Sequence, residues 1–398
     1  MFRLMSLVHN QARVTKLANK DIVLKRFTDD QKLLACWLAL HRTPGVGPIT
    51  FMRLLAQFPN LQLLFENPKL AKNISERSYQ ALLAPNWDLV EQDLLWFEEP
   101  NRHIVTIQDE RYPHLLKEIV DSPSILFVEG DASLLSEWQL GIIGSRNPSV
   151  TGRDNAFEFS RFLAHGGLTI TSGLSEGIDA AAHQGALAVK GKTLSVIGSG
   201  LDCIYPEKQR ELARDIVQEG ALVSEFALGT SPRPENFPRR NRLISGLSLG
   251  VLVVEASSRS RSLGTARMAL EQGREVFSIP GSIHNPLAKG CHQLIREGAK
   301  LVETAEDIIE ELGALAGAGE VLEKKEAMVN SGPRTLDGDY QLLFTCLGYD
   351  PVGIDTLAEQ SGLTVDIVSS MLLLLELEGR VASLSGGRYT RVNGSGIK

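Results

Sequence analysis

The sequence predicts an α/β fold, in which a Rossmann-like, doubly wound and mostly parallel sheet lies between a helical N-terminal domain and a C-terminal winged helix. Three observations support this prediction. Strand and helix patterns alternate from about residue 140 to residue 312, apolar residues recur at spacings of three and four before this region, and a helix-turn-helix with a hairpin closes the chain.

Five segments follow from changes in composition and pattern along the 398 residues. The first is basic and is not followed by a small-residue cleavage site. We therefore expect a disordered extension or an upstream start codon, although a mitochondrial presequence has a similar composition. A segment rich in Gly, Ala, Lys and Glu is the expected linker. The predicted bounds are 1–29 for the extension, 30–100 for the helical domain, 101–314 for the Rossmann-like domain, 315–338 for the linker and 339–398 for the winged helix.

The helical domain contains the turn TPGVGP at residues 43–48, between the amphipathic runs LLACWLALHR and ITFMRLLAQF. No helix continues through this turn, because proline and glycine interrupt it repeatedly. The pattern favours a SAM-like or helix-hairpin-helix domain, and in the latter motif the turn amides can bind DNA phosphate. A plain connection in a small helical bundle gives the same pattern and is the commoner explanation.

Several strands predicted in the Rossmann-like domain are continuous aliphatic runs, as is typical of strands covered by helices on both faces. Helical patterns separate them, which predicts a parallel sheet. The predicted strands are 140–143, 168–171, 193–197, 222–224, 250–255 and 275–279, and the predicted helices are 152–165, 178–189, 207–219, 263–272 and 289–297.

The last segment predicts a winged helix, with helices at 354–360 and 365–377 and a hairpin formed by 381–384 and 388–391. DNA-binding proteins of this shape place basic and amide side chains on the second helix. Here that helix contains acidic residues and no Lys or Arg. We therefore expect it to contact protein or to pack within the chain rather than to bind DNA.

The formal net charge of −7 argues weakly against a nucleic-acid partner, but the charge is unevenly distributed. Residues 141–303 contain 19 Lys and Arg against 16 Asp and Glu, whereas residues 337–398 contain 4 against 8, so the middle of the chain is the part that could attract phosphate. The four cysteines are far apart, and we predict no metal site, no disulfide and no cofactor. No apolar run has membrane-spanning length, so we expect a cytoplasmic protein with no membrane partner.

Glycine-bearing turns follow three successive predicted strands, in GIIGSR, TSGLSEG and VIGSG. Backbone amides converge in a turn between a buried strand and a helix, and glycine lets an anion approach closely. Because the carboxyl ends of parallel strands share one edge of the sheet, we expect these turns to form a common phosphate site. The residues predicted to form it are Gly144, Ser145, Arg146, Ser172 and Gly173.

Three arginines stand within four residues in the segment NFPRRNR. A guanidinium binds phosphate through two parallel hydrogen bonds, and an exposed phenylalanine offers a face on which a base stacks. Stacking needs an unpaired base, so the segment favours a single strand over a duplex. A solvated charged run that caps a helix is the alternative. The residues predicted to bind are Phe237, Arg239, Arg240, Asn241 and Arg242.

An enzyme on the same scaffold is the competing hypothesis. GLSEG fits the G-x-S-x-G nucleophile pattern around Ser175, and Glu176, Asp179 and Glu255 are candidate acids or bases. No downstream acid and histidine are marked out as partners of Ser175, and His183, one helical turn after Asp179, is more often a structural contact. We therefore predict a binding protein without catalytic residues, with a nucleotide-processing hydrolase as the alternative.

Six motifs occur in a fixed order along the chain: GIIGSRNPSVTG, TSGLSEGIDAAAHQGAL, GKTLSVIGSGLDCIYP, SEFALGTSPRPENFPRRNRLISGLS, VLVVEA and EVFSIPGS. Together they resemble the DNA-processing protein A (DprA, or Smf) family, closely over residues 112–306 and more loosely at both ends. The resemblance implies an extended Rossmann fold, single-stranded DNA binding, a homodimer, and loading of RecA recombinase during natural transformation or related recombination.

The resemblance also implies roles for individual residues. Arg146 would bind backbone phosphate in a pocket shared with other side chains. The residues implied to line or neighbour that pocket are Phe237, Arg239, Asn241, Arg242, Lys192 and Lys208. The family's motif near Ser260 usually has glycine and an aliphatic residue where this chain has Arg261 and Gly264, which puts the geometry of that loop in doubt.

Overall fold

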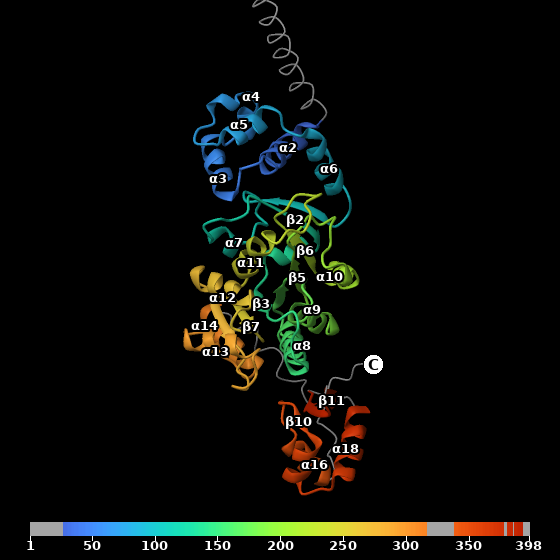
Figure 1. The fold of residues 1–398 in the computed structure, drawn as a ribbon. Helices are drawn as coiled ribbons and strands as arrows, with labels where there is room; N and C mark the ends of the chain where they lie inside the picture. The colour runs from blue at the N-terminus through green and yellow to red at the C-terminus, as the bar shows by residue number, and fades with distance from the viewer. Residues whose placement is uncertain (1–26, 317–337, 378–379, 385, 393–398) are drawn as a thin grey trace, which may run out of the picture.

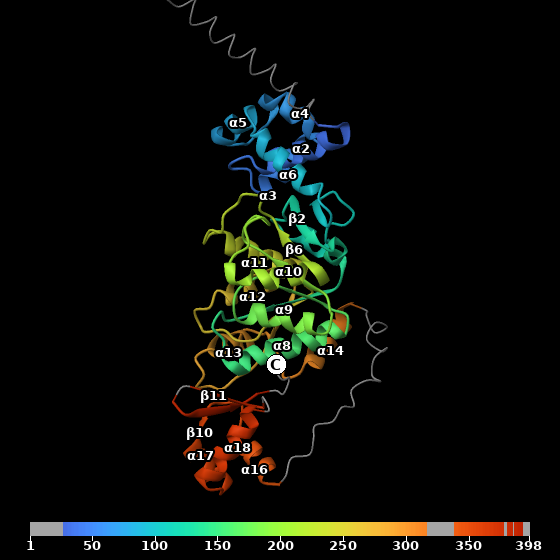
Figure 2. The same cartoon turned by 90° about the vertical axis from the view of Figure 1, so that its right-hand side faces the viewer.

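The computed structural model describes residues 27–316, 338–377, 380–384 and 386–392. The N-terminal helical domain, the sheet domain and the winged helix follow one another from one end of the molecule to the other (Figures 1 and 2). The fold class predicted from the sequence is confirmed. The predicted N-terminal extension and linker lie largely outside the described residues.

The N-terminal domain consists of short helices around a core that includes Leu38, Phe51 and Leu64. Its first helix begins after Thr28, whose hydroxyl accepts a hydrogen bond from the Gln31 backbone amide. The Gln31 side chain in turn accepts one from the Thr28 backbone amide, and this capping box fixes the start of the helix. The elements are α2 (Asp29–His41), α3 (Pro48–Gln57), α4 (Leu61–Glu66), η1 (Pro68–Leu70), α5 (Glu76–Leu83) and α6 (Trp87–Phe97).

The central sheet contains nine strands within the described residues, in the order β1-β2-β6-β5-β4-β3-β7-β8-β9. The strands from β6 to β9 in this order are parallel, whereas β2 pairs antiparallel with β6 and β1 with β2. The direction of winding reverses between β3 and β7, and ligands of open sheets collect at the carboxyl ends of strands near such a point. The strands are β1 (Arg102–Thr106), β2 (Ile125–Gly130), β3 (Gln139–Ile143), β4 (Thr169–Ser172), β5 (Thr193–Val196), β6 (Ala221–Ser224), β7 (Gly250–Val253), β8 (Glu275–Ser278) and β9 (Lys300–Leu301).

Helices cover both faces of the sheet. Side chains of α8, α9 and α14 belong to one apolar cluster and those of α11 and α12 to another, which is continuous with the core of the N-terminal domain. The start of α8 is fixed to the end of β7, because the Glu255 carboxylate accepts hydrogen bonds from the Ser149 amide at 2.8 Å and from its hydroxyl at 2.6 Å. The elements are α7 (His114–Glu118), η2 (Ala132–Ser136), α8 (Val150–His165), α9 (Ile178–Ala188), η3 (Glu207–Gln209), α10 (Arg210–Glu219), α11 (Asn236–Leu247), α12 (Ser262–Glu271), α13 (Lys289–Arg296) and α14 (Ala305–Ala316).

Helix α11 is not among the helices predicted from the sequence. Pro238 in its first turn and the clustered arginines hide the apolar spacing of Leu243, Ile244 and Leu247, which are all buried. Proline is tolerated there because the amides of a first turn have no acceptor within the helix. Helix α14 and strand β9 were also not predicted, and β1 and β2 extend the main sheet beyond β6.

The winged helix matches its predicted elements within one residue. Helices α16 (Gly338–Cys346), α17 (Ile354–Ser361) and α18 (Val365–Leu377) share an apolar core, and β10 (Val352–Gly353), β11 (Val381–Leu384) and β12 (Arg388–Arg391) form a small antiparallel sheet. The Thr151 hydroxyl of α8 donates a hydrogen bond of 3.2 Å to the Tyr349 carbonyl. Over the described ranges, every helix is too short or too polar to cross a bilayer.

Arg42 joins the N-terminal domain to the sheet domain. Its guanidinium donates two hydrogen bonds, of 2.5 and 2.6 Å, to the Asp93 carboxylate and a third, of 3.0 Å, to the Leu228 carbonyl. Asp93 is fully buried, and burial raises the pKa of its carboxyl although Arg42 opposes the shift. In the same junction the rings of Trp96 and Phe127 lie 6.1 Å apart. Apolar packing and the hydrogen bond from Arg42 to Leu228 therefore hold the two domains together, and the buried ion pair with Asp93, within the N-terminal domain, fixes the position of Arg42.

Arg42→Gln should lower the free energy of unfolding at neutral pH by about 3–5 kcal/mol, because the Asp93 carboxylate is then buried without its cation. Loss of Arg42 raises the pKa of Asp93 further in the folded protein but not in the unfolded chain. The destabilisation should thus be small below the ordinary Asp pKa, where Asp93 is protonated in both proteins. It should grow as the pH rises through the raised pKa of Asp93 in the folded protein. Urea denaturation from acidic to neutral pH measures this. Adding Asp93→Asn should abolish the pH dependence, and a loss that was equal at every pH would contradict the account.

Candidate functional site

A pocket of about 310 Å³ lies at the carboxyl ends of β3, β4 and β5. The turns that follow these strands form its walls together with the first turn of α11, so the three glycine-bearing turns lie side by side as expected. The volume is at the small end of the range for ligand pockets. The lining residues are Arg146, Asn147, Leu174, Ser175, Glu176, Ile197, Gly198, Tyr205, Pro206, Phe237 and Arg240.

A cation and two aromatic rings form one side of this pocket. The guanidinium carbon of Arg146 lies 5.9 Å from the centre of the Phe237 ring, and that ring lies 6.0 Å from the ring of Tyr205. Arg146 is exposed, and no carboxylate among the described residues lies within ion-pair distance of it. Its charge is therefore available to a ligand, next to a ring face that is only partly buried.

The buried guanidinium of Arg240 forms the floor of the pocket. Its Nη1 donates a hydrogen bond of 2.6 Å to the Val196 carbonyl at the end of β5, and its Nε donates one of 3.1 Å to the Asn241 side chain. Asp179 is buried nearby, and burial raises the pKa of its carboxyl while the charge of Arg240 opposes the shift. The pocket thus has a second positive charge beneath its surface.

Two positions around the floor of the pocket require glycine, because other atoms lie too close to leave room for a side chain. A Cβ on Gly173 would lie 2.1 Å from Nη1 of Arg240, so a side chain at residue 173 would displace the guanidinium. Gly177 has a φ of +84°, and a Cβ there would lie 2.4 Å from the Ser145 carbonyl oxygen. These glycines let the turns after β3 and β4 pack against α11 and against each other.

The candidate acids and bases of the enzyme hypothesis are engaged in structural contacts. His183 is buried, with Nδ1 and Nε2 each 2.7 Å from a partner, the Thr193 hydroxyl and the Gly173 carbonyl, and burial lowers its pKa to about 4. Glu255 holds the start of α8, and Glu176 lies 3.7 Å from the Lys208 ammonium. Over the described ranges, no three His, Cys, Asp or Glu side chains gather in a way that could hold a metal ion.

Only some of the other residues predicted to bind phosphate lie at the pocket. Gly144 and Ser145 shape the turn after β3, where the Ile178 amide donates to the Ser145 carbonyl at 3.1 Å. Ser172 is fully buried and its hydroxyl donates to the Ile142 carbonyl at 2.6 Å, so it does not reach the pocket. Lys208 is exposed at the rim beside Glu176. Lys192 precedes β5 and thus lies at the opposite, amino-terminal edge of the sheet, away from the pocket.

The expectation that the arginines of α11 share one pocket is wrong in part. Because the segment is helical, Phe237 and Arg240 face the pocket, whereas Arg239 and Arg242 line a second cavity on the other side of the helix. Arg242 is buried and forms ion pairs with Glu225 and, at 3.2 Å, with Asp121. Asn241 accepts from Arg240 and supports the floor.

Three residues that line the pocket were not predicted from the sequence: Asn147, Tyr205 and Pro206. Tyr205 and Pro206 are the last residues of the motif GKTLSVIGSGLDCIYP, which contains the third glycine turn. An aromatic residue shortly after such a turn is the pattern that could have indicated a pocket residue. Nor did the sequence indicate that Arg240 would be buried, because a run of arginines is usually solvated.

Comparison with known proteins gives a consistent result for all three domains. Residues 103–313 match the family described as DNA recombination-mediator protein A, residues 30–85 match the DprA-like N-terminal HHH domain, and residues 330–387 match the DprA winged helix domain.

Individual relatives cover most of the chain. It is 44% identical to Protein Smf of Escherichia coli over 308 residues, which are 76% of this chain and 81% of that protein. It is 43% identical to DNA processing protein DprA of Bacillus subtilis over 217 residues, 54% of this chain and 73% of that protein. The X-ray structure of DNA processing protein A from Streptococcus pneumoniae superposes with a TM-score of 0.63 and 35% identity, over 70% of this chain and 97% of that one.

Gly173→Ala should destabilise the fold by about 1–3 kcal/mol, since the new methyl group forces Arg240 off the Val196 carbonyl and leaves buried polar groups unpaired. Gly264→Ala is the matched control, because a Cβ there has open space inside helix α12 and should stabilise by about 0.5–1 kcal/mol. Urea denaturation of both variants measures the difference. Equal stabilities of the two variants would show that Arg240 is not held as described.

Proposed function

Because this chain belongs to the DNA recombination-mediator protein A family, we propose that it binds single-stranded DNA in the pocket between Arg146 and Phe237 and delivers the strand to RecA recombinase. The observation that carries the proposal is the exposed guanidinium of Arg146, 5.9 Å from the centre of the Phe237 ring. A guanidinium suits a backbone phosphate and an aromatic face suits a stacked base.

The aromatic wall of the pocket favours an unpaired strand. The Phe237 ring lines a cavity of about 310 Å³, which has room for a base that stacks on the ring. A base can enter such a pocket only when it is outside a duplex, and the cost of extracting it is smallest in single-stranded DNA. The proposed ligand is therefore a flexible strand whose bases are free to turn toward the protein.

The charges around the pocket support a phosphate ligand. Lys208, with 83% of its side chain exposed, lies 3.7 Å from Glu176 and offsets the charge of that carboxylate at the rim. Arg240 attracts a phosphate from beneath, through a low-dielectric interior in which charges interact strongly. We assign direct phosphate contact to Arg146, neutralisation of Glu176 at the rim to Lys208, and an indirect electrostatic role to Arg240.

A binding role is better supported than nucleotide hydrolysis. A serine nucleophile needs a base within hydrogen-bond reach, and the nearby His183 has both nitrogens engaged and a pKa lowered to about 4. Glu255 is engaged with Ser149 at the start of α8. Incubation with nucleoside monophosphates tests the hydrolase directly, and release of free base would overturn the binding proposal.

Arg146→Ala should weaken binding of oligo-dT and reduce its salt dependence. Loss of one phosphate contact should flatten the log–log slope of affinity against salt by about 0.7, the value for one phosphate of a single strand. Lys192→Ala is the matched control, because it removes an exposed cation from the amino-terminal edge of the sheet and should leave the slope unchanged. Fluorescence anisotropy titrations at several salt concentrations measure this, and equal slopes for both variants would remove Arg146 from the site.

Phe237→Ala should cost roughly 1–3 kcal/mol of binding free energy for a single strand if a base stacks on the ring. Phe237→Tyr keeps the aromatic face and should bind almost as well as the natural protein. The same titrations at one salt concentration measure both variants. If Phe237→Ala and Phe237→Tyr bound DNA equally, no base would stack there.

Delivery to RecA and homodimer formation are the finer parts of the proposal, and both rest on family membership. The protein should shorten the delay before RecA assembles on a single strand, and Arg146→Ala should lose this effect. Light scattering should give a mass near that of two chains. A monomer that still accelerated RecA assembly would contradict the dimer while leaving the DNA pocket in place.

A further inference from the structure

The loop after β7, residues 254–261, leaves the sheet beside the glycine turn that follows β3. The two strands are neighbours, and the Val254 amide donates a hydrogen bond of 3.1 Å to the Ile143 carbonyl. Neighbouring strands are about 4.8 Å apart, so the loop and the glycine turn emerge side by side. The loop contains Arg259 and Arg261, and both side chains are exposed.

Hydrogen bonds fix the position of this loop on both sides. The Ser262 hydroxyl, at the end of the loop, donates a hydrogen bond of 2.7 Å to the Gly144 carbonyl in the turn after β3. On the other side, the Ala256 amide donates to the Leu287 carbonyl at 2.8 Å, and the Gly290 amide donates to the Ala256 carbonyl at 2.7 Å. A loop that is already held in place loses little conformational entropy when a ligand binds to it.

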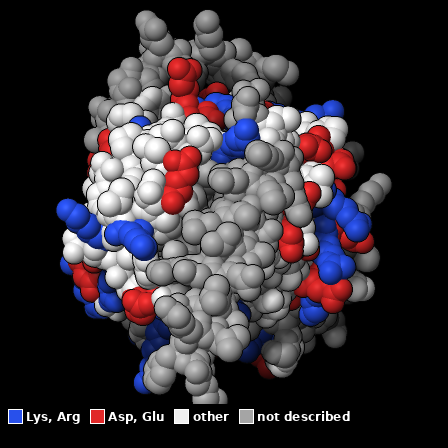
Figure 3. Space-filling model, turned by 90° about the horizontal axis from the view of Figure 1, so that it is seen from above, with Lys and Arg blue, Asp and Glu red and all other residues white. Residues whose placement is uncertain are grey.

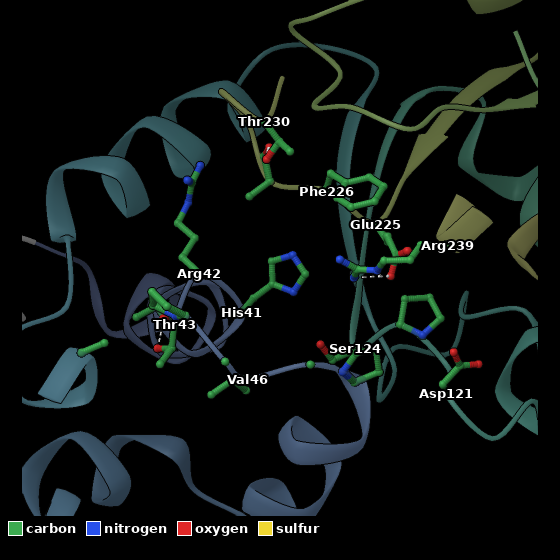
Figure 4. Close-up of a pocket in the computed structure, with 18 of the residues that line it drawn as sticks. His41, Arg42, Thr43, Val46, Asp121, Ser124, Glu225, Phe226, Thr230 and Arg239 are labelled. Atoms are coloured by element: carbon green, nitrogen blue, oxygen red, sulfur yellow. Dashed lines mark hydrogen bonds and ion pairs between the residues drawn. The ribbon is translucent and has the colours of Figure 1, made fainter. Parts of the chain in front are cut away.

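The charges of the two loop arginines are not matched by acids. Arg239 is a contrast, because it pairs with Glu225 in the second cavity (Figure 4). Among the described residues, no carboxylate lies within ion-pair distance of Arg259 or Arg261. The acid nearest to them in sequence, Glu255, is buried and holds the start of α8. The loop thus adds two unmatched cations to the one in the turn after β3.

The order of the strands places this loop directly beside the DNA pocket. Along the carboxyl edge of the sheet, β5, β4 and β3 carry the turns that form the pocket, and β7 comes next after β3. The turn of Arg146 therefore lies between the turn after β4 and the loop of Arg259 and Arg261. A strand that keeps a base on Phe237 and a phosphate at Arg146 brings its next phosphates over this loop when it continues along the edge.

The opposite direction, past the turn after β5, is less favourable for a polyanion. The cations that follow this turn are paired with acids, because the Lys208 ammonium lies 3.7 Å from Glu176 and the Arg210 guanidinium lies 3.4 Å from Glu207. A phosphate that approached them would also meet the carboxylates. The distribution of unmatched charge thus favours the direction toward β7.

We propose that the single strand leaves the pocket toward β7, and that Arg259 and Arg261 contact the phosphates next to the one at Arg146. The inference rests on the proposed function, because the base on Phe237 anchors the strand. It assigns a direction to that function, along the carboxyl edge and across the point where the winding of the sheet reverses. The binding site then holds several consecutive nucleotides instead of one.

The test combines Arg259→Gln with Arg261→Gln in the full-length protein. Neither arginine has an ion-pair partner among the described residues, so the fold should be unchanged. For oligo-dT of about 20 nucleotides, the log–log slope of affinity against salt should flatten by about 1.4, twice the value for one phosphate of a single strand. A strand of about four nucleotides, which fills the pocket without extending over the loop, should bind the double variant and the natural protein alike.

A matched control separates local contact from the change in net charge. Arg214→Gln removes an exposed cation from α10, which packs against β5 and β6 and not against β7. Arg261→Gln alone should flatten the slope for the long strand by about 0.7, whereas Arg214→Gln should leave it unchanged. Arg261→Lys retains the charge and should keep most of the natural slope.

The outcomes separate this inference from the function on which it rests. If Arg146→Ala weakens strand binding but the double variant keeps the natural slope on long strands, the direction toward β7 is wrong and the proposed function stands. Equal effects of Arg261→Gln and Arg214→Gln would also overturn the direction, because they would reflect net charge alone. If the natural protein binds no single strand, both the direction and the proposed function fail.

Discussion

The contact of the Arg240 guanidinium with the carboxyl end of β5 is the constraint on which both cavities of the sheet domain depend. Through this contact, at 2.6 Å to the Val196 carbonyl, the first turns of α11 lie against the sheet edge, and glycine at residue 173 leaves the space that the guanidinium needs. The helix then presents Phe237 to one side and Arg239 to the other. A buried arginine therefore organises the site without having to touch a ligand, and the exposed Arg146 is left to do so.

The distribution of charge explains how an acidic protein can hold a polyanion. The chain carries a formal net charge of −7, and acidic and basic side chains are interspersed on the described surface at the N-terminal end (Figure 3). Around the two cavities, however, the acids that form ion pairs have basic partners: Glu176 pairs with Lys208, and Glu225 pairs with both Arg239 and Arg242. Pairing of this kind removes repulsion locally while leaving Arg146 unpaired by any described carboxylate. Net charge describes the whole surface, whereas binding depends on the few charges that lack a partner.

Much of the fold could be predicted because aliphatic runs and glycine turns carry a local signal. The strands that end at Ile143 and Val196 and the helices of the winged domain follow directly from periodicity. The separation of the arginines between two cavities could not be predicted, because it depends on whether residues 236–242 form a helix. As an extended segment the three arginines would lie on both sides of one strand, but as a helix they separate Arg240 from Arg239 and Arg242. The ion pairs that bury Arg242 join residues distant in sequence, and no local pattern marks them. Lys192 was misplaced for a simpler reason, since a residue before a parallel strand lies at the edge opposite to the ligand.

Photo-crosslinking with a single strand that carries 5-iododeoxyuridine tests the central claim most directly, because this base reacts with aromatic side chains on which it stacks. The account predicts that the crosslinked peptides, identified by mass spectrometry, contain Phe237 or Tyr205, whose rings lie 6.0 Å apart in the pocket. Crosslinks confined to the winged helix or to the amino-terminal edge of the sheet, with none in the peptides of the pocket, would contradict it.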